Sequence, residues 1–257
     1  MPRPRVFRRE GIILRELDYA EADRILTILT PAGKVSALAK GVRRVTSHKA
    51  GHLGLFSRVS LMLAQGRNLD IVTQAEGIEE FEGLRKDLER FSYASYVAEV
   101  VDRVAPEDED VSSLYDLLMV ALRWFSEEED LVLGARLFEL RLLEYAGYQA
   151  ELFECVSCQT RLEAEENYFS NEMGGLLCPR CGAGRQGVRA VSVNAQKVLR
   201  YLARHEPEII RGLRVSPATH AELEALLMGY LEYTLERDLN SAHLIRRLKQ
   251  ELSAGRG

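Results

Sequence analysis

The chain has 257 residues, of which 46% are hydrophobic and 28% are charged. This is the composition of a soluble globular protein, and the length is sufficient for one large domain or two to three small ones. No apolar run approaches the roughly 18 residues that cross a bilayer, so we expect no membrane partner. The basic first ten residues are followed by Glu16 and Asp18 rather than by a signal-peptide segment, which predicts a cytoplasmic protein.

The net charge of −5 is unevenly distributed. Residues 1–75 hold 13 Lys and Arg against 6 Asp and Glu, a net charge of +7, whereas residues 76–257 carry −12. A basic N-terminal third of the chain, followed by an acidic remainder, predicts that the N-terminal region contacts a polyanion.

The first 80 residues alternate short apolar stretches with turn residues. This pattern predicts five strands, at about 6–17, 24–30, 34–40, 58–65 and 69–76. Pro31-Ala-Gly33 supplies a tight turn between the second and third strands, because proline presets φ and glycine accepts a positive φ. Five strands in about 80 residues predict a small closed barrel of the oligonucleotide-binding (OB) type.

After residue 80 the apolar period changes from two to 3.6 residues, as in Tyr93, Val97 and Val101. Acidic connections at 106–110 and 126–130 suit helix N-termini, and Thr219 with Glu222 predicts a capping box. The expected fold is therefore α+β and multidomain. A five-stranded OB-fold β-barrel (1–80) precedes an α-helical domain (81–257), which a cysteine-containing segment interrupts at about 150–190.

All four cysteines lie in that segment, with the spacing C-x2-C-x19-C-x2-C. They are Cys155, Cys158, Cys178 and Cys181. Two such pairs can close a tetrahedron of thiolates, which predicts a structural zinc ion with no open position for a substrate. Iron in the same cage is the alternative metal. Two disulfides are disfavoured in a reducing cytosol, and a redox C-x2-C needs only one pair.

Basic residues cluster on the third predicted strand, on the loop after it and near the N-terminus. On the strand, Lys34 and Lys40 share one face, opposite Ala37 and Ala39. Few aromatic residues accompany these cations, so backbone contact should outweigh base stacking. The predicted DNA-binding residues are Arg5, Arg8, Arg9, Lys34, Lys40, Arg43, Arg44 and Lys49.

Enzyme motifs are missing. Gly33-Lys34 is not a P-loop, because Ile28 stands where the first glycine is needed and Val35 where a serine or threonine should follow. No cysteine remains outside the metal set to act as a nucleophile, so we expect a protein that is not an enzyme. The alternative function is a zinc-ribbon, sequence-specific DNA-binding regulator, with contacts from Arg161, Arg180, Arg185 and Arg189.

Several motifs resemble the RecO family of recombination mediators over the whole length of the chain. They are Gly11-Ile-Ile-Leu14, Asp23, Thr30, Gly33-Lys34, Ala39-Lys-Gly-Val-Arg-Arg44, Leu53 with Phe56, Gly66-Arg-Asn-Leu69, Phe169, Gly174-Gly175 and Leu177-Cys-Pro-Arg-Cys181. The resemblance implies an N-terminal OB domain, binding of single- and double-stranded DNA, and annealing of complementary strands in the RecFOR pathway of DNA repair. Other members of the family lack the cysteines, so zinc is not required for the family's activity.

The resemblance also implies protein partners: RecR, the C-terminal tail of the single-stranded-DNA-binding protein SSB and, indirectly, RecA on nucleoid DNA. The acidic, apolar-ended SSB tail is expected in a groove of the helical domain, where a cation lies beside apolar residues. Arg123, Arg136 and Arg141 are the candidates. Each of them is equally compatible with an ordinary surface arginine whose stem packs on apolar neighbours.

Overall fold

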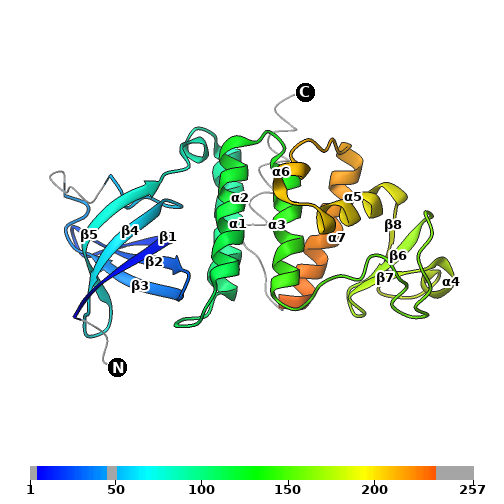
Figure 1. Ribbon diagram of the computed structural model, residues 1–257, viewed down its shortest axis with the longest axis horizontal. Coiled ribbons are helices and arrows are strands. Elements are labelled where there is room, and N and C mark those ends of the chain that lie inside the picture. The colour runs from blue at the N-terminus through cyan, green and yellow to red at the C-terminus, as the bar shows by residue number, and fades with distance from the viewer. Residues whose placement is uncertain (1–4, 45–50, 236–257) are drawn as a thin grey trace. The chain divides into compact units, whose positions relative to one another are not determined.

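The computed structural model describes residues 5–44 and 51–235, and Figure 1 shows its helices and strands. By packing it divides into two compact units, one up to Glu127 and one that begins at Glu128. Each unit is described by itself below. Within the described residues, no helix is both long and apolar enough to cross a membrane.

The first unit begins with a closed five-stranded barrel whose strands pair in the order β1-β2-β3-β5-β4, with β4 returning to β1. Only the β3–β5 pair is parallel. The strands are β1 (Val6–Tyr19), β2 (Asp23–Thr30), β3 (Gly33–Ala39), β4 (Arg58–Ala64) and β5 (Asp70–Glu79). This closed barrel confirms the predicted OB-fold domain.

The barrel core combines an alternating strand, β4, with continuous buried runs at 11–14 on β1 and 26–30 on β2. On β4, Val59, Leu61 and Leu63 all point inward and are at most 1% exposed. At Gly11 in β1, an added Cβ would lie 2.5 Å from Cγ2 of Ile28. The close approach of β1 to β2 therefore requires a glycine at this position.

Two helices complete the first unit: α1 (Leu88–Val104) and α2 (Ser112–Glu127), preceded by the short 3₁₀ helix η1 (Glu82–Arg85). Figure 1 shows both helices beside the barrel. The ring of Tyr93 on α1 lies 5.5 Å from that of Phe125 on α2, which fixes how the two helices pack. Val97 and Val101 are also fully buried, as the 3.6-residue period predicted.

The β2–β3 turn is fastened to the connection between α1 and α2. The backbone N–H of Lys34 donates to Pro106 O at 2.9 Å, and that of Val111 donates to Pro31 O at 2.9 Å. Gly33 has a φ of +108°, and an added Cβ would lie 2.6 Å from the amide nitrogen of Asp108. The turn thus serves to join barrel and helices, and glycine is required for the close approach.

The second unit contains α3 (Leu131–Tyr145), α5 (Val193–Arg204), α6 (Pro207–Ile210) and α7 (Pro217–Leu235). The side chain of Ser192 caps α5 by accepting the N–H of Ala195. Glu222 on α7 accepts from the backbone N–H of Ser192 at 2.6 Å and from its hydroxyl at 2.7 Å. One glutamate therefore joins the start of α5 to α7.

Between α3 and α5 lies the cysteine segment, which forms a small sheet of strand order β7-β6-β8 and one short helix. Its elements are β6 (Asn167–Ser170), β7 (Gly175–Leu177), α4 (Pro179–Gly182) and β8 (Val188–Val191). In Figure 1 these elements gather at one end of the second unit, beyond α5. The expected α+β architecture with an inserted cysteine segment is confirmed.

The predicted capping interactions have mixed outcomes. Asp110 accepts the N–H of Ser112 at 3.0 Å and Asp130 accepts that of Leu133 at 2.9 Å, so both acidic connections cap helices as expected. The prediction of a capping box formed by Thr219 and Glu222 is wrong. Ser216 caps α7 by accepting the N–H of Thr219, while Glu222 binds Ser192. The expected domain boundary at residue 80 stays a prediction.

Candidate metal centre and nucleic-acid interface

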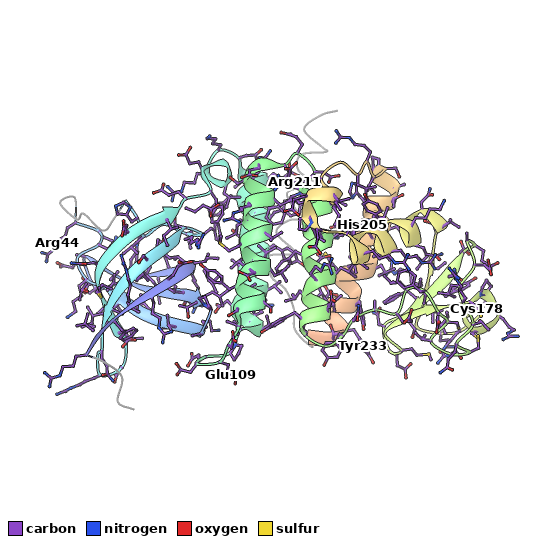
Figure 2. The ribbon with its side chains drawn as sticks, in the orientation of Figure 1. Arg44, Glu109, Cys178, His205, Arg211 and Tyr233 are labelled. Carbon is purple, nitrogen blue, oxygen red and sulfur yellow. The ribbon has the colours of Figure 1, made fainter. Side chains whose placement is uncertain are left out.

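The four cysteine sulfurs form one cluster in which every pair lies within 4.8 Å. The Sγ atoms of Cys158 and Cys178 are 3.8 Å apart. Sulfurs about 2.3 Å from a central zinc ion would stand about 3.8 Å apart in a tetrahedron. The cluster is placed to hold a metal ion, and its dimensions are compatible with zinc. Figure 2 shows Cys178 within this segment.

Each cysteine pair is held by a tight backbone turn. In the first, Gln159 N–H donates to Cys155 O at 2.8 Å; in the second, Cys181 N–H donates to Cys178 O at 3.0 Å. Cys178 N–H also donates to Sγ of Cys155 at 3.4 Å, which links the two turns. Amide donors pointing at sulfur favour the thiolate form that a metal requires.

The thiols alone cannot all ionise at such short separations. Hydrogen bonds from Thr160 lower the pKa of Cys158 to about 5, whereas hydrogen bonds with Cys158 and Cys178 raise the pKa of Cys181 to about 11. Interaction with the side chain of Cys158 raises the pKa of the Arg180 guanidinium. A bound cation removes the repulsion between neighbouring thiolates and allows all four to serve as ligands.

The barrel cations expected to contact DNA divide into groups. Lys40, Arg43 and Arg44, which we call the barrel cation cluster, follow β3 and are all exposed. Their loop docks on the β1–β2 turn, since Arg43 N–H donates to Ala22 O at 3.0 Å. Lys40 and Arg44 have no ion pair within the described residues, and Figure 2 shows Arg44 at the outer edge of the barrel. Arg43 lies 3.5 Å from Asp18.

Lys34 lies elsewhere and is already engaged. Its ammonium contacts the carboxylate of Asp102 on α1 at 3.0 Å and the backbone oxygen of the same residue, and its side chain is 20% exposed. It therefore joins the barrel to α1 and is less available to a phosphate than Lys40. The sequence pattern placed both lysines on one strand face but contained no signal for Asp102.

The three arginines at the start of β1 form a second group. Arg5 is exposed, Arg8 is paired with Glu76 at 3.2 Å, and Arg9 lies over the ring of Phe7 at 5.6 Å. Lys49, the last of the expected DNA contacts, lies outside the described residues. The assignment of these eight cations to DNA binding stays a prediction.

Two residues near these groups were absent from the predicted site. Arg67, in the β4–β5 turn, is exposed and has no ion pair within the described part of the chain. Tyr19 is 53% exposed at the end of β1, beside Asp18, which contacts Arg43. For Tyr19, the position at a predicted turn and the nearby cations were the sequence signals that could have predicted a base-stacking residue.

The three arginines proposed for the SSB tail are all engaged in intramolecular contacts. Arg123 on α2 makes a bidentate ion pair with Glu79, with both N–O distances at 2.8 Å. Arg136 is buried and paired with Glu139 at 2.6 Å, so a surface contact through its side chain would need a rearrangement. Arg141 contacts Glu144 at 3.0 Å and the backbone oxygen of His205. Of the two candidates in the second unit, Arg141 has an accessible side chain and Arg136 does not.

Comparison with known proteins covers nearly the whole chain. The protein-family model "Recombination protein O N terminal" matches residues 5–81, and the family model "Recombination protein O C terminal" matches residues 85–243. A protein of a Roseiflexus species named "DNA repair protein RecO" is 44% identical over 250 residues, 97% of this chain and 88% of the relative. Relatives of the same name are 38% identical in Pelotomaculum thermopropionicum and 36% in Dehalococcoides mccartyi, and in each the match covers more than nine tenths of both chains.

These matches place a chain with a closed barrel, a helical unit and four cysteines positioned to hold a metal ion among DNA repair proteins. The chain belongs to the RecO family.

Proposed function

We propose that the protein is a recombination mediator that binds single- and double-stranded DNA without sequence specificity and anneals complementary strands. With RecR, it helps RecA to replace SSB on single-stranded DNA. The barrel cation cluster is the observation that carries the DNA-binding part of this proposal. Lys40 and Arg44 are exposed and lack carboxylate partners within the described residues, so they remain available to phosphates.

The mechanism is electrostatic. Cations on the barrel neutralise phosphates and release counterions, which lowers the repulsion between two strands that approach each other. Contacts to phosphates carry no sequence information, so binding is general. Tyr19 adds a stacking surface that any base can use.

The metal in the four-cysteine cluster is proposed to be structural Zn²⁺. Four protein ligands fill a tetrahedron, so the ion stabilises the segment and leaves no position for a water or substrate. No catalytic role is assigned to any residue, and the protein acts as a binding module in the cytoplasm, on nucleoid DNA. A sequence-specific zinc-ribbon regulator is less well supported, because α4 has only four residues and is too short to serve as a recognition helix.

Contacts with RecR and with the SSB tail belong to the proposal as well. Of the three arginines considered for the tail, Arg141 is the first to change, because its side chain is accessible in the second unit. Substitution of Arg123 or Arg136 would instead disturb ion pairs that hold the fold. Binding of a tail peptide to an Arg141→Gln variant, measured by fluorescence anisotropy, tests this assignment.

The triple variant K40Q/R43Q/R44Q tests the barrel cation cluster. Affinity for single strands of unrelated sequence should fall by similar factors. The slope of log K against log salt should decrease by about 2, because each lost contact with a single strand accounts for about 0.7. The control K86Q/R103Q/R211Q removes three cations already paired with Glu82, Glu99 and Glu128. Equal slopes for parent and triple variant would remove the barrel site.

A further inference from the structure

A second group of cations lies on the second unit, around α5 and the cysteine segment. On α5, Lys197, Arg200 and Arg204 are spaced by three and four residues, so they share one face of the helix. Arg161, just after the first cysteine turn, acts electrostatically on Arg200. We call these four residues the α5 cation face. α5 lies beside the β-sheet of the cysteine segment in Figure 1.

The ring of Phe153 organises this face. The guanidinium carbon of Arg204 lies 4.0 Å from the ring centroid, and that of Arg200 lies 5.6 Å from it. Arg200 also donates from Nε to Leu152 O at 2.8 Å. A guanidinium stacked by its face keeps its edge N–H donors directed outward, and the stacking reduces the entropy lost when those donors bind a ligand.

The charges on this face are not neutralised. Within the described residues, none of the four cations forms an ion pair with a carboxylate. Burial, followed by the like charges of Arg204 and Arg161, lowers the pKa of Arg200, and no carboxylate counteracts them. Such a concentration of positive charge is unusual in the part of the chain that carries a net −12. It is the electrostatic signature of a binding site for a polyanion.

We propose that the α5 cation face is a second phosphate-binding surface, which takes the backbone of a nucleic-acid strand independently of the barrel. The choice of DNA as the ligand rests on the proposed function, whereas the location of the surface does not. Annealing requires that two strands be held, and a second surface allows one chain to bind both. Arg200 and Phe153 position the face, while Lys197, Arg204 and Arg161, which are exposed, contact the phosphates.

A nucleic-acid strand fits this face better than an acidic peptide does. The hollow next to Phe153, of about 150 Å³, is lined by Glu144 and Glu151. Their carboxylates would oppose an acidic peptide that inserted an apolar side chain there. A strand that runs across the exposed cations has no need to enter the hollow, and guanidinium forks match phosphate oxygens.

The test uses the full-length, metal-loaded protein and the variant K197Q/R204Q, titrated with oligothymidylate at several salt concentrations. Affinity should fall several-fold, and the salt slope should decrease by about 1.4 for two lost contacts with a single strand. The control R211Q/R214Q removes two cations from the same unit that already interact with Glu128 and Asp130. The charge-preserving variant K197R/R204K should keep the slope of the parent.

The outcomes separate this proposal from the proposed function. If K197Q/R204Q binds as the parent does while K40Q/R43Q/R44Q is weakened, the α5 site is overturned and the barrel site stands. The reverse result overturns the barrel assignment and supports the α5 face. If K197Q/R204Q loses affinity for oligoglutamate but not for oligothymidylate, the occupant is an acidic peptide and the proposal fails.

Arg204 packs on Phe153, so its substitution removes a contact with the cysteine segment. Metal content and the thermal unfolding midpoint are therefore measured for each variant. The single variant R161Q provides an independent result, because Arg161 is exposed and stacks on no ring among the residues that the structure describes. Where K197Q/R204Q is folded, its slope decides as stated above. Where it is not, a decrease of the salt slope by about 0.7 in a folded R161Q supports the face, and an unchanged slope in a folded R161Q overturns it.

Discussion

The barrel and the cysteine segment are stabilised by opposite means. In the barrel, many alternating apolar side chains fill one core, and each contributes a part of the stability. The cysteine segment has three strands of three or four residues, too little to build a core of comparable size. Its two turns are joined through four sulfurs instead. Stability is thus distributed in one region and concentrated in the other, and the two should respond differently to single substitutions.

Loss of one metal ligand should have the largest effect. Cys178→Ser removes a ligand that connects both turns, and structural zinc contributes on the order of 10 kcal/mol to such segments. We expect loss of bound metal and rapid amide exchange over 151–191, with the barrel amides unchanged. Metal analysis and hydrogen exchange provide the measurement. Glu163→Gln, an exposed change in the same segment, is the control. Protection that persists in Cys178→Ser would contradict the concentrated stability inferred here.

A single core substitution in the barrel should have a smaller, graded effect. Leu61 is 1% exposed, and Leu61→Ala should cost about 2–5 kcal/mol, from lost burial and the cavity left behind. The barrel should still fold, because its other core residues remain. Denaturant unfolding of the variant measures the loss. Leu17→Ala, at a position that is 60% exposed, should change the stability by less than about 0.5 kcal/mol. Complete unfolding of Leu61→Ala would mean that the barrel, too, depends on single residues.

The same contrast explains which features the sequence predicted. The barrel strands were found to within about three residues, because apolar stretches of seven or more residues bounded by turn residues are a repeated signal. The cysteine cluster was found from its spacing alone. Strands β7 and β8 were missed, since three or four residues cannot display a period, and Gly175–Leu177 is buried on both faces.

Interactions between elements distant in sequence were the least predictable. Lys34 shares a strand face with Lys40, yet it binds Asp102, 68 residues away. Glu222 has the spacing of a capping box with Thr219, yet it binds Ser192. A local pattern reports which positions share a face, but the partner on that face depends on packing, which a single sequence does not display. In the α5 cation face, the helical spacing of Lys197, Arg200 and Arg204 is a local pattern, but the approach of Arg161 to Arg200 is produced only by the fold.

The smallest predicted effect concerns the ion pair between Arg123 and Glu79, which ties α2 to β5 within the first unit. The hydrogen bond from Arg123 lowers the pKa of Glu79, against the opposing effect of burial. A carboxylate whose pKa is lowered by folding contributes its full stabilisation at pH values above the ordinary glutamate pKa of 4.5. This contribution is lost as the pH falls through the folded-state pKa. Because both side chains are partly exposed, Arg123→Gln should cost only about 1 kcal/mol at neutral pH.

Denaturant unfolding of the parent and of Arg123→Gln as a function of pH measures this contribution. The difference between them should be constant above pH 4.5 and should shrink as the pH falls below that value. Lys86→Gln, which removes an exposed ion pair with Glu82 at 3.9 Å, should show almost no difference at any pH. A difference between parent and Arg123→Gln that stayed constant into acid would mean that the arginine acts through packing of its stem. The joint between barrel and helices would then resemble the barrel core, with stability distributed over many contacts.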